Sequence, residues 1–210
     1  MTQLIKLLFF AFVIKPLGLI MLGLNIRNRQ GLPSSGPAII AANHNSHLDT
    51  IVLMSLYPLS QIHRVRPVAA ADYFLKNKFL KWFSLNIMGI IPLERKARKS
   101  KDELFVGCKS ALENQEILIL YPEGSRGEAG KMAELKKGIY HISKLVEETR
   151  VVPVLMHGLD KALPKGEALF VPFNCDVIIG QEIKHDEGAQ VFIEELKNEF
   201  QKLSEFCLTH

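Results

Sequence analysis

A histidine and an aspartate five residues apart, His44 and Asp49, form the most chemically suggestive pattern in the chain. They follow an apolar run that ends near residue 42, and open α/β sheets place their sites at the carboxyl ends of strands. A carboxylate against one imidazole nitrogen fixes the tautomer and stabilises the imidazolium, so that the other nitrogen can take a proton from a hydroxyl. The spacing therefore predicts His44 as a general base and Asp49 as its partner.

Other interpretations of this segment stay open. Ser46 and Asp49 have the spacing of an acidic capping box, which would explain both residues at a helix start without catalysis. His44 and His47 are also compatible with ordinary core or surface histidines. A metal site at His44, His47 and Asp49 is disfavoured because no further ligand set is evident, and no metal is predicted.

A second polar segment follows the apolar run at residues 117–121. It contains, in sequence, Glu123, Gly124, Ser125 and Arg126. The glycine lets a ligand approach the backbone, the serine offers a hydroxyl, and the guanidinium suits bidentate phosphate binding. The alternative is an ordinary strand-to-helix turn with a solvated arginine.

Basic residues accumulate in two places. Arg95 follows an apolar run at residues 88–93 and precedes several lysines and arginines, a cluster that suits a phosphate, an anionic lipid or an acidic acyl carrier. Lys136 and Lys137 add positive charge after the second segment. Runs of this kind are also common on solvated helix starts, so the charge alone decides nothing.

The elements that must position these residues alternate between short apolar runs and longer amphipathic stretches. Strands are predicted at residues 37–42, 66–71, 88–93, 117–121, 151–156, 169–173 and 175–179. Helices are predicted at residues 49–59, 73–85, 98–114, 132–148 and 190–206. The fold class is therefore α/β, a single domain with a mixed, mostly parallel sheet flanked by helices, in which the last two strands form a hairpin.

The N-terminal residues 4–26 are apolar enough to meet lipid, but Lys15 and Pro16 divide them. We expect two short helices lying in one leaflet of a membrane. A single spanning helix and a buried helix packed on the domain are the alternatives. The predicted organisation is residues 1–34 as N-terminal membrane-associating helices and residues 35–210 as the catalytic domain.

Composition limits the other possibilities. Of the 210 residues 48% are apolar, which supports a substantial core, and the net charge of +4 is too small to imply nucleic acid but suits an anionic membrane surface. The three cysteines, Cys108, Cys175 and Cys207, are widely spaced and odd in number, as expected in a reducing compartment. No G-x-S-x-G segment is present, so a covalent intermediate is not expected.

Together and in this order, the segments resemble the lysophospholipid acyltransferase family, which includes 1-acylglycerol-3-phosphate acyltransferases. The first family motif, N-H-x-S-x-x-D, is matched by residues 43–49. The second, a glycine followed by apolar residues and an arginine, resembles residues 89–95, and the third, F-P-E-G-T-R, resembles residues 121–126 with two conservative changes. A fourth, V-P-V, matches residues 152–154. The resemblance covers roughly residues 35–180.

The resemblance implies an enzyme that moves a fatty acyl group from acyl-CoA or acyl carrier protein to the hydroxyl of a lysophospholipid. It implies His44 as the base and Asp49 as its partner. Around the phosphate-bearing acceptor it implies Arg95, Glu123, Gly124 and Arg126, to which the loop chemistry adds Ser125. No cofactor is expected beyond the donor. Membrane lipids are expected partners, nucleic acid is not, and the expected location is the cytoplasmic face of a membrane, the inner membrane in a bacterium.

One departure bears on the acceptor. Many members active on 1-acylglycerol-3-phosphate carry a lysine in an A-K-K-like stretch before the second motif, where this chain has alanines and an aspartate at residues 69–72. The acceptor expected first is still 1-acylglycerol-3-phosphate, giving phosphatidic acid. Another lysolipid or an amino-acid-derived lipid is the alternative, and a thioester hydrolase and a silent lipid-binding module are the rivals of other classes.

Overall fold

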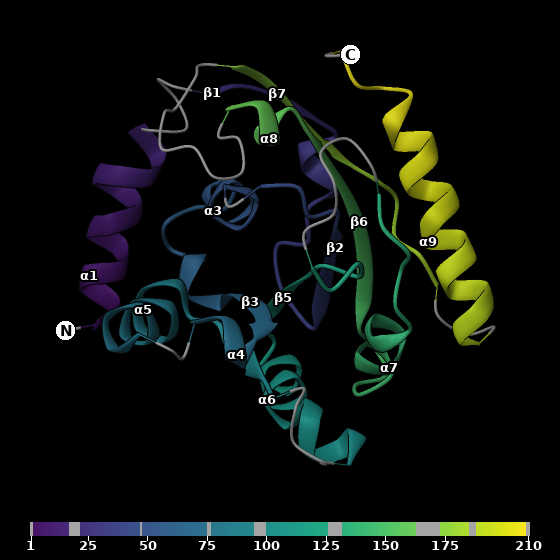
Figure 1. Ribbon diagram of the computed structural model, residues 1–210, viewed down its shortest axis with the longest axis horizontal. Coiled ribbons are helices and arrows are strands. Elements are labelled where there is room, and N and C mark those ends of the chain that lie inside the picture. Colours follow the sequence, from purple (N-terminus) through teal and green to yellow (C-terminus); the bar gives the residue numbers. More distant parts are fainter. Residues whose placement is uncertain are drawn as a thin grey trace.

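A seven-stranded sheet forms the centre of the computed structural model, which describes residues 2–16, 22–46, 48–74, 77–94, 100–125, 132–162, 173–184 and 188–208 (Figure 1). The strands are β1 (Leu22–Arg27), β2 (Ala38–Ala42), β3 (Val65–Ala70), β4 (Ile91–Leu93), β5 (Ile117–Leu120), β6 (Arg150–His157) and β7 (Phe173–Ile179). Their order across the sheet is β1-β7-β6-β2-β5-β3-β4. Among these seven strands β6 and β7 run antiparallel and the other neighbours run parallel, which confirms the mixed, mostly parallel sheet.

Strand β2 lies near the middle of the sheet because both of its edges are paired. Ala41 has Leu120 of β5 on one side and Pro153 of β6 on the other. All five residues of β2 are buried, as expected for a parallel strand that is covered on both faces. The carboxyl ends of β2 and β5 therefore meet at one edge of the sheet, where residues 43–49 and 121–125 begin.

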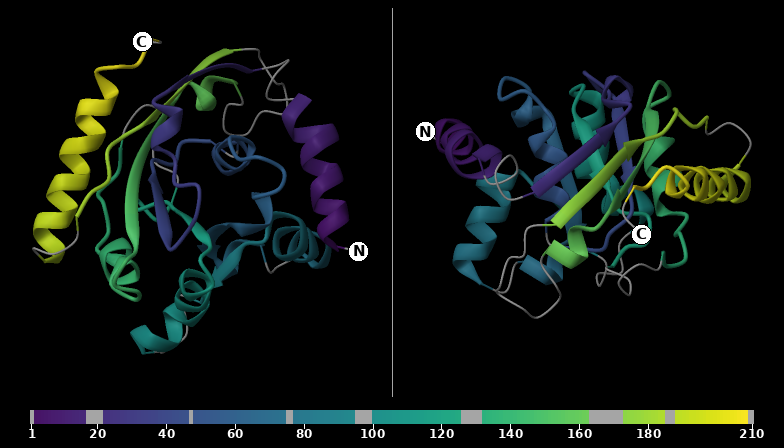
Figure 2. Two further views of the ribbon diagram at one scale, coloured as in Figure 1. Left: turned by 180° about the vertical axis from the view of Figure 1, so that it is seen from behind. Right: turned by 90° about the horizontal axis from the view of Figure 1, so that it is seen from above.

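Helices cover both faces. The described helical elements are α1 (Thr2–Phe9), η1 (Phe10–Ile14), η2 (Arg29–Gly31), α3 (Asp49–Ser55), η3 (Ile62–Arg64), α4 (Ala71–Phe74), α5 (Lys78–Phe83), η4 (Ser84–Met88), α6 (Lys101–Glu113), α7 (Gly138–Ser143), α8 (Leu159–Ala162) and α9 (Ala189–Ser204). Alternate β2 residues enter two cores, Ile40 on the side of η1 and α3, and Ile39 on the side of α6, α7 and α9. Figure 2 shows α1 and α9 on opposite sides of the sheet.

The N-terminal segment differs from the prediction. Residues 2–16 form one continuous helix, α1 followed by the π-helix η1 and a further turn, so Lys15 and Pro16 lie at its end. The second helix predicted within residues 4–26 is wrong, because Leu22–Arg27 is strand β1, which pairs in parallel with β7. Phe10 is fully buried in the core, so the helix packs on the domain by one side. Within the described residues, no helix has the length and hydropathy needed to cross a bilayer.

Three further predicted elements are shorter or divided. The helix expected at residues 73–85 is split into α4 and α5, and the strand expected at residues 88–93 begins only at Ile91, after η4 ends at Gly89 in a left-handed conformation (φ +71°). Of the helix expected at residues 132–148, only α7 is helical. The strand expected at residues 169–173 falls almost wholly outside the described residues.

Candidate active site

His44 follows β2 by two residues, and its ring meets Asp49 at the start of α3. The Nδ1 of His44 lies 2.8 Å from Oδ2 of Asp49, with the His44 side chain 21% exposed and the Asp49 side chain 1% exposed. No hydrogen bond to Nε2 of His44 is made by the described residues. The pair therefore has the geometry of an imidazole whose orientation is fixed through one nitrogen while the ring reaches solvent.

The Asp49 carboxylate also organises the turn that carries His44. Its Oδ2 accepts the backbone N–H groups of Asn45 and Ser46, both at 2.8 Å. The Ser46 hydroxyl accepts the N–H of Leu48 at 3.3 Å. The capping interpretation is thus correct in part, because Asp49 caps the turn, and the same oxygen also receives the His44 ring.

Asn43 fixes this turn to the neighbouring strand. Its side chain is buried and makes two hydrogen bonds with Met156 of β6, donating to the carbonyl at 2.8 Å and accepting from the N–H at 2.7 Å. An amide side chain can replace the two hydrogen bonds of a strand neighbour where β2 ends. The backbone is therefore held by hydrogen bonds on the residue before His44, Asn43, and on the two residues after it, Asn45 and Ser46.

Tyr121 lies directly against the His44 ring. The ring centroids are 4.1 Å apart with planes at 21°, a stacked arrangement, and the Tyr121 hydroxyl lies 2.8 Å from Oγ1 of Thr50. Burial raises the pKa of the Tyr121 hydroxyl well above its usual value, the charge of Asp49 raises it further, and the Thr50 hydrogen bond opposes them. The phenol is therefore neutral at physiological pH, and its ring packs against one face of the imidazole.

Glu123 connects the two polar segments. Its buried carboxylate accepts the backbone N–H of His44 through Oε1 and the N–H of Ala133 through Oε2, both at 2.8 Å. Hydrogen bonds from backbone amides to an ionised carboxylate are stronger than neutral ones. Glu123 thus holds the histidine backbone, a contact that the sequence did not indicate; its predicted contact with the acceptor remains a prediction.

Gly124 and Ser125 continue this loop toward the surface. Gly124 has a left-handed backbone (φ +74°), and a Cβ there would lie 3.0 Å from Nζ of Lys136. The Lys136 N–H donates to the carbonyl of Pro122 at 2.9 Å, and both Lys136 and Ser125 are exposed. An ammonium group, considered only as a solvated charge from the sequence, therefore lies over the loop beside His44.

Of the seven predicted site residues, His44, Asp49 and Glu123 are joined by hydrogen bonds, and Gly124 directly follows Glu123. Ser125 lies on the same loop. Arg95 and Arg126, like His47, fall outside the described residues. Tyr121, Thr50 and Asn43 were missed as site residues. Their only signal was adjacency to the motifs, since nothing in the sequence shows that residues 50 and 121 meet.

Cys108 and Cys175 are not suited to nucleophilic attack. Burial raises the pKa of the Cys108 thiol to about 12, and burial followed by the nearby aspartates raises that of Cys175 to about 12. Since the thiolate is the reactive form, both groups are inert at neutral pH. The arrangement around His44 supports direct proton transfer from a hydroxyl.

The chain is similar to known acyltransferases. A family model described as Acyltransferase matches residues 23–157. The chain is 29% identical over 177 residues to 1-acyl-sn-glycerol-3-phosphate acyltransferase LPAT1, chloroplastic, of Arabidopsis thaliana, covering 83% of this chain and 47% of that protein. It is 24% identical over 153 residues to 1-acyl-sn-glycerol-3-phosphate acyltransferase alpha of Homo sapiens, covering 72% of this chain and 52% of that protein. The chain thus spans about half the length of these curated relatives.

A solved structure supports the fold. The crystal structure of the 1-acyl-sn-glycerophosphate acyltransferase PlsC from Thermotoga maritima superposes with a TM-score of 0.74 at 19% identity, over 97% of this chain and 78% of that one. The arrangement of the sheet is therefore shared with that protein.

Proposed function

The chain belongs to the acyltransferase family, whose model spans residues 23–157, and from this we propose that it acylates 1-acylglycerol-3-phosphate to phosphatidic acid. The donor is a fatty acyl thioester, either acyl-CoA or acyl carrier protein. The observation that carries the proposal is the 2.8 Å contact between Nδ1 of His44 and the buried carboxylate of Asp49, in a ring that is still partly exposed.

The reaction follows from this pair. Nε2 of His44 takes the proton of the acceptor hydroxyl while its oxygen attacks the thioester carbonyl, and Asp49 stabilises the imidazolium. The C–S bond then breaks, and the imidazolium returns the proton to the leaving thiolate, so that a hydroxyl and a thioester become an ester and a thiol. General-base assistance of this kind contributes about 10²–10⁴-fold.

The acceptor phosphate is assigned to the loop after β5. Gly124 allows close approach to the backbone, and the Lys136 ammonium near that glycine supplies a positive charge on the loop whose Glu123 binds the His44 backbone. Many family members carry a phosphate-binding lysine before the second motif, where this chain has alanines at residues 69–71. Lys136 would supply the positive charge that those alanines lack. Arg95 and Arg126 remain proposed contacts on the family resemblance.

We place α1 and η1 at the surface of a membrane. One side of this helix packs on the core through Phe10 and Ile14, while the opposite side exposes Leu4, Leu8 and Phe12, the last at 74%. A helix that packs on the core by one side and exposes apolar side chains on the opposite side needs a second cover. The three cysteines are buried and form no disulfide with one another, which suits a reducing compartment such as the cytoplasmic face of a membrane.

To test the proposal, the purified full-length chain is bound to phosphatidylcholine vesicles. It is then incubated with acyl-CoA or with an acyl carrier protein thioester, and with each member of a panel of lysolipids. The proposal expects phosphatidic acid from 1-acylglycerol-3-phosphate, and at least tenfold less product from lysophosphatidylcholine, which lacks a phosphate monoester. Release of free fatty acid without a new ester would instead identify a hydrolase. No turnover of any thioester by the folded protein would identify a silent lipid-binding module.

A further inference from the structure

We propose that α5 forms, together with α1 and η1, a single face that docks on an anionic bilayer. This inference rests on the membrane attachment proposed above and adds a second, separate helix to it. In α5, Phe79 is 72% exposed, Trp82 is 46% exposed and Leu80 is 38% exposed. Phe79 and Trp82 are three residues apart, so they lie on the same side of the helix.

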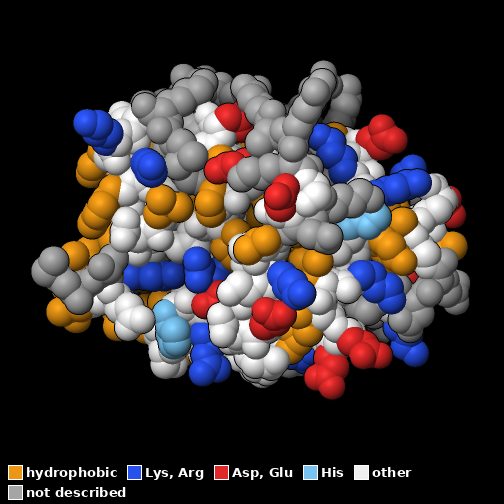
Figure 3. All heavy atoms as spheres, turned by 90° about the horizontal axis from the view of Figure 1, so that it is seen from below, with side chains coloured by type: hydrophobic (Ala, Val, Ile, Leu, Met, Phe, Trp, Pro, Cys, Tyr) orange, Lys and Arg blue, Asp and Glu red, His pale blue; other side chains and the backbone are white. Residues whose placement is uncertain are grey.

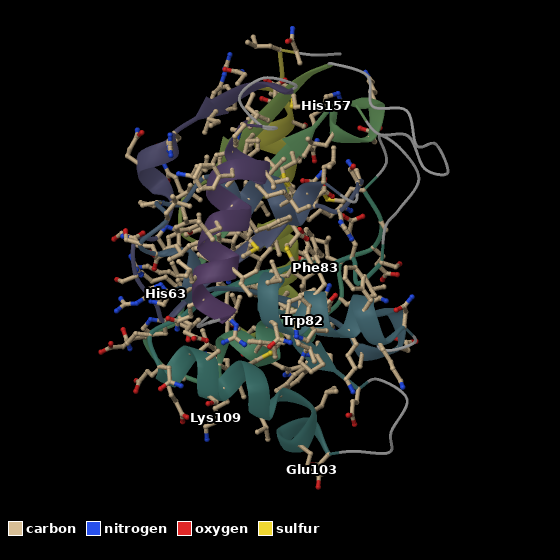
Figure 4. The ribbon with its side chains drawn as sticks, turned by 90° about the vertical axis from the view of Figure 1, so that its left-hand side faces the viewer. His63, Trp82, Phe83, Glu103, Lys109 and His157 are labelled. Carbon is tan, nitrogen blue, oxygen red and sulfur yellow. The ribbon has the colours of Figure 1, made fainter. Side chains whose placement is uncertain are left out.

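Helices α1 and α5 are neighbours. Phe83 at the end of α5 packs edge-to-face on Phe9 of α1, with ring centroids 5.4 Å apart. Figure 4, which looks onto this side of the molecule, shows Trp82 and Phe83 beside α1. Figure 3 shows hydrophobic side chains gathered toward its left-hand edge, where α1 and α5 lie in Figure 1. Two helices about 70 positions apart in the sequence thus pack against each other, and both carry exposed hydrophobic side chains.

Many of the large hydrophobic side chains that are exposed in the described residues belong to these two helical segments. They are Leu4, Ile5, Leu8, Phe12 and Val13 from α1 and η1, and Phe79, Leu80 and Trp82 from α5. We call these eight residues the apolar face. Single exposed hydrophobic residues need no explanation, whereas a contiguous patch marks an interaction site.

The charges around the apolar face favour anionic lipid over another protein. Lys78 and Lys81 of α5 are exposed, and residues 2–16 and 77–93 contain no acidic residue. Lysines beside an anionic leaflet are each worth roughly fivefold in binding. A two-fold dimer through this face would bring the lysines of both copies into one interface without an acidic residue from residues 2–16 or 77–93 to pair with them, which is unfavourable. Trp82 and Phe79 are amphipathic or aromatic types enriched where a protein meets the bilayer interface.

The position of α5 also suits a lipid substrate. In chain order α5 follows β3 and α4, and the carboxyl end of β3 lies at the same sheet edge as that of β2, which His44 follows. A face that rests on the membrane at this side brings the active-site edge toward the lipid acceptor. The occupant of the apolar face is therefore a leaflet that contains anionic lipid.

Trp82 is the chain's single tryptophan, so its fluorescence reports on α5 in the unmodified full-length protein. We expect vesicles of equal parts phosphatidylglycerol and phosphatidylcholine to shift Trp82 emission to shorter wavelength and to protect it from an aqueous quencher. Phe79→Ser should weaken vesicle partitioning roughly tenfold to a hundredfold, from the burial energy of one aromatic side chain. Lys78→Gln with Lys81→Gln should weaken it roughly twentyfold to thirtyfold on anionic vesicles alone.

Matched variants separate this inference from general effects. Phe206→Ser removes an aromatic side chain that is 53% exposed and lies two residues after α9, a helix on the other side of the sheet from α1, and should not change partitioning. Lys109→Gln on α6 is the matched charge change. His44→Ala should bind vesicles like wild type, so a failure of catalysis and a failure of docking are distinguishable.

Two results would overturn the inference. Co-sedimentation with vesicles without any change in Trp82 emission would show that α1 docks alone. An emission shift that depends on protein concentration and not on vesicles would show that a second copy covers the apolar face.

Discussion

The ring of Tyr121 stacks on the ring of His44 at 4.1 Å, and its hydroxyl is held 2.8 Å from Oγ1 of Thr50. Thr50 and Asp49 both belong to α3. Tyr121, which is hydrogen-bonded to Thr50, thus restrains the plane of the His44 ring, while Asp49 binds its Nδ1. We expect Tyr121→Phe to lower kcat several-fold and to leave the acceptor KM unchanged, because stacking remains while the restraint on the ring is lost. Loss of one hydrogen bond should cost about 1 kcal/mol of unfolding free energy.

Thr50→Val is the matched partner for this prediction, since it removes the other hydroxyl with little change of shape. If the two hydroxyls act through each other, the double variant should be no slower than the worse single variant. Fully additive effects on kcat would show that the Tyr121–Thr50 contact does not position His44.

Glu123 should be sensitive to loss of a single oxygen. Glu123→Gln keeps the shape but turns one acceptor into an NH₂ donor, which would face either the N–H of His44 or that of Ala133. We expect a loss of about 1–3 kcal/mol in denaturant unfolding and at least a tenfold lower kcat. Wild-type stability and rate in this variant would mean that the carboxylate does not hold the His44 backbone.

Lys136 is expected to recognise the acceptor rather than to take part in the chemistry. Lys136→Met should raise the KM for 1-acylglycerol-3-phosphate about tenfold with kcat nearly unchanged, because a charge used equally in ground and transition states affects binding alone. Lys137→Met, one residue further and also exposed, is the control. An equal rise in KM for the two variants would mean that Lys136 does not contact the acceptor specifically and only adds to the overall positive charge of this surface.

Lys6 predicts a pH dependence of stability. Burial and then Arg66 lower the pKa of Lys6 from 10.5 to about 8, while Glu116 opposes them. Because the unfolded chain holds this proton more tightly, the charged lysine destabilises the fold below pH 8, and the penalty fades as the pH approaches 10.5. Lys6→Met should therefore add on the order of 3 kcal/mol at neutral pH.

The measurement for Lys6 is denaturant unfolding of wild type and Lys6→Met across this pH range. The gain should shrink steadily as the medium becomes alkaline. The exposed Lys137→Met should show no such trend. A gain that is constant with pH would mean that packing of the methionine, and not the charge, is responsible.

The parts of the fold that the sequence predicted best are those with local signals. β2, β5 and α3 follow from continuous apolar runs and helical periodicity, and the first motif places His44 and Asp49 within five residues of each other. Their contact needs only a tight turn, so short-range reasoning was sufficient. The predicted proximity of His44 and Asp49 is confirmed by the 2.8 Å contact.

Other features depend on partners that are distant in the sequence. β1 looks like the second half of an apolar helix and becomes a strand because β7, about 150 residues away, offers it an edge. The expected helix at residues 132–148 is shortened because Glu123 and Pro122 bind the N–H groups of Ala133 and Lys136 in a loop. Tertiary hydrogen bonds of this kind override local propensity.

The most direct measurement is single-turnover acyl transfer by His44→Ala, compared with wild type at saturating acyl thioester and 1-acylglycerol-3-phosphate. Removal of the proton acceptor should slow ester formation about 10²–10⁴-fold while the far-UV spectrum and thioester binding stay unchanged. Ester formation within a few-fold of wild type would contradict the assignment of His44 as the group that takes the proton.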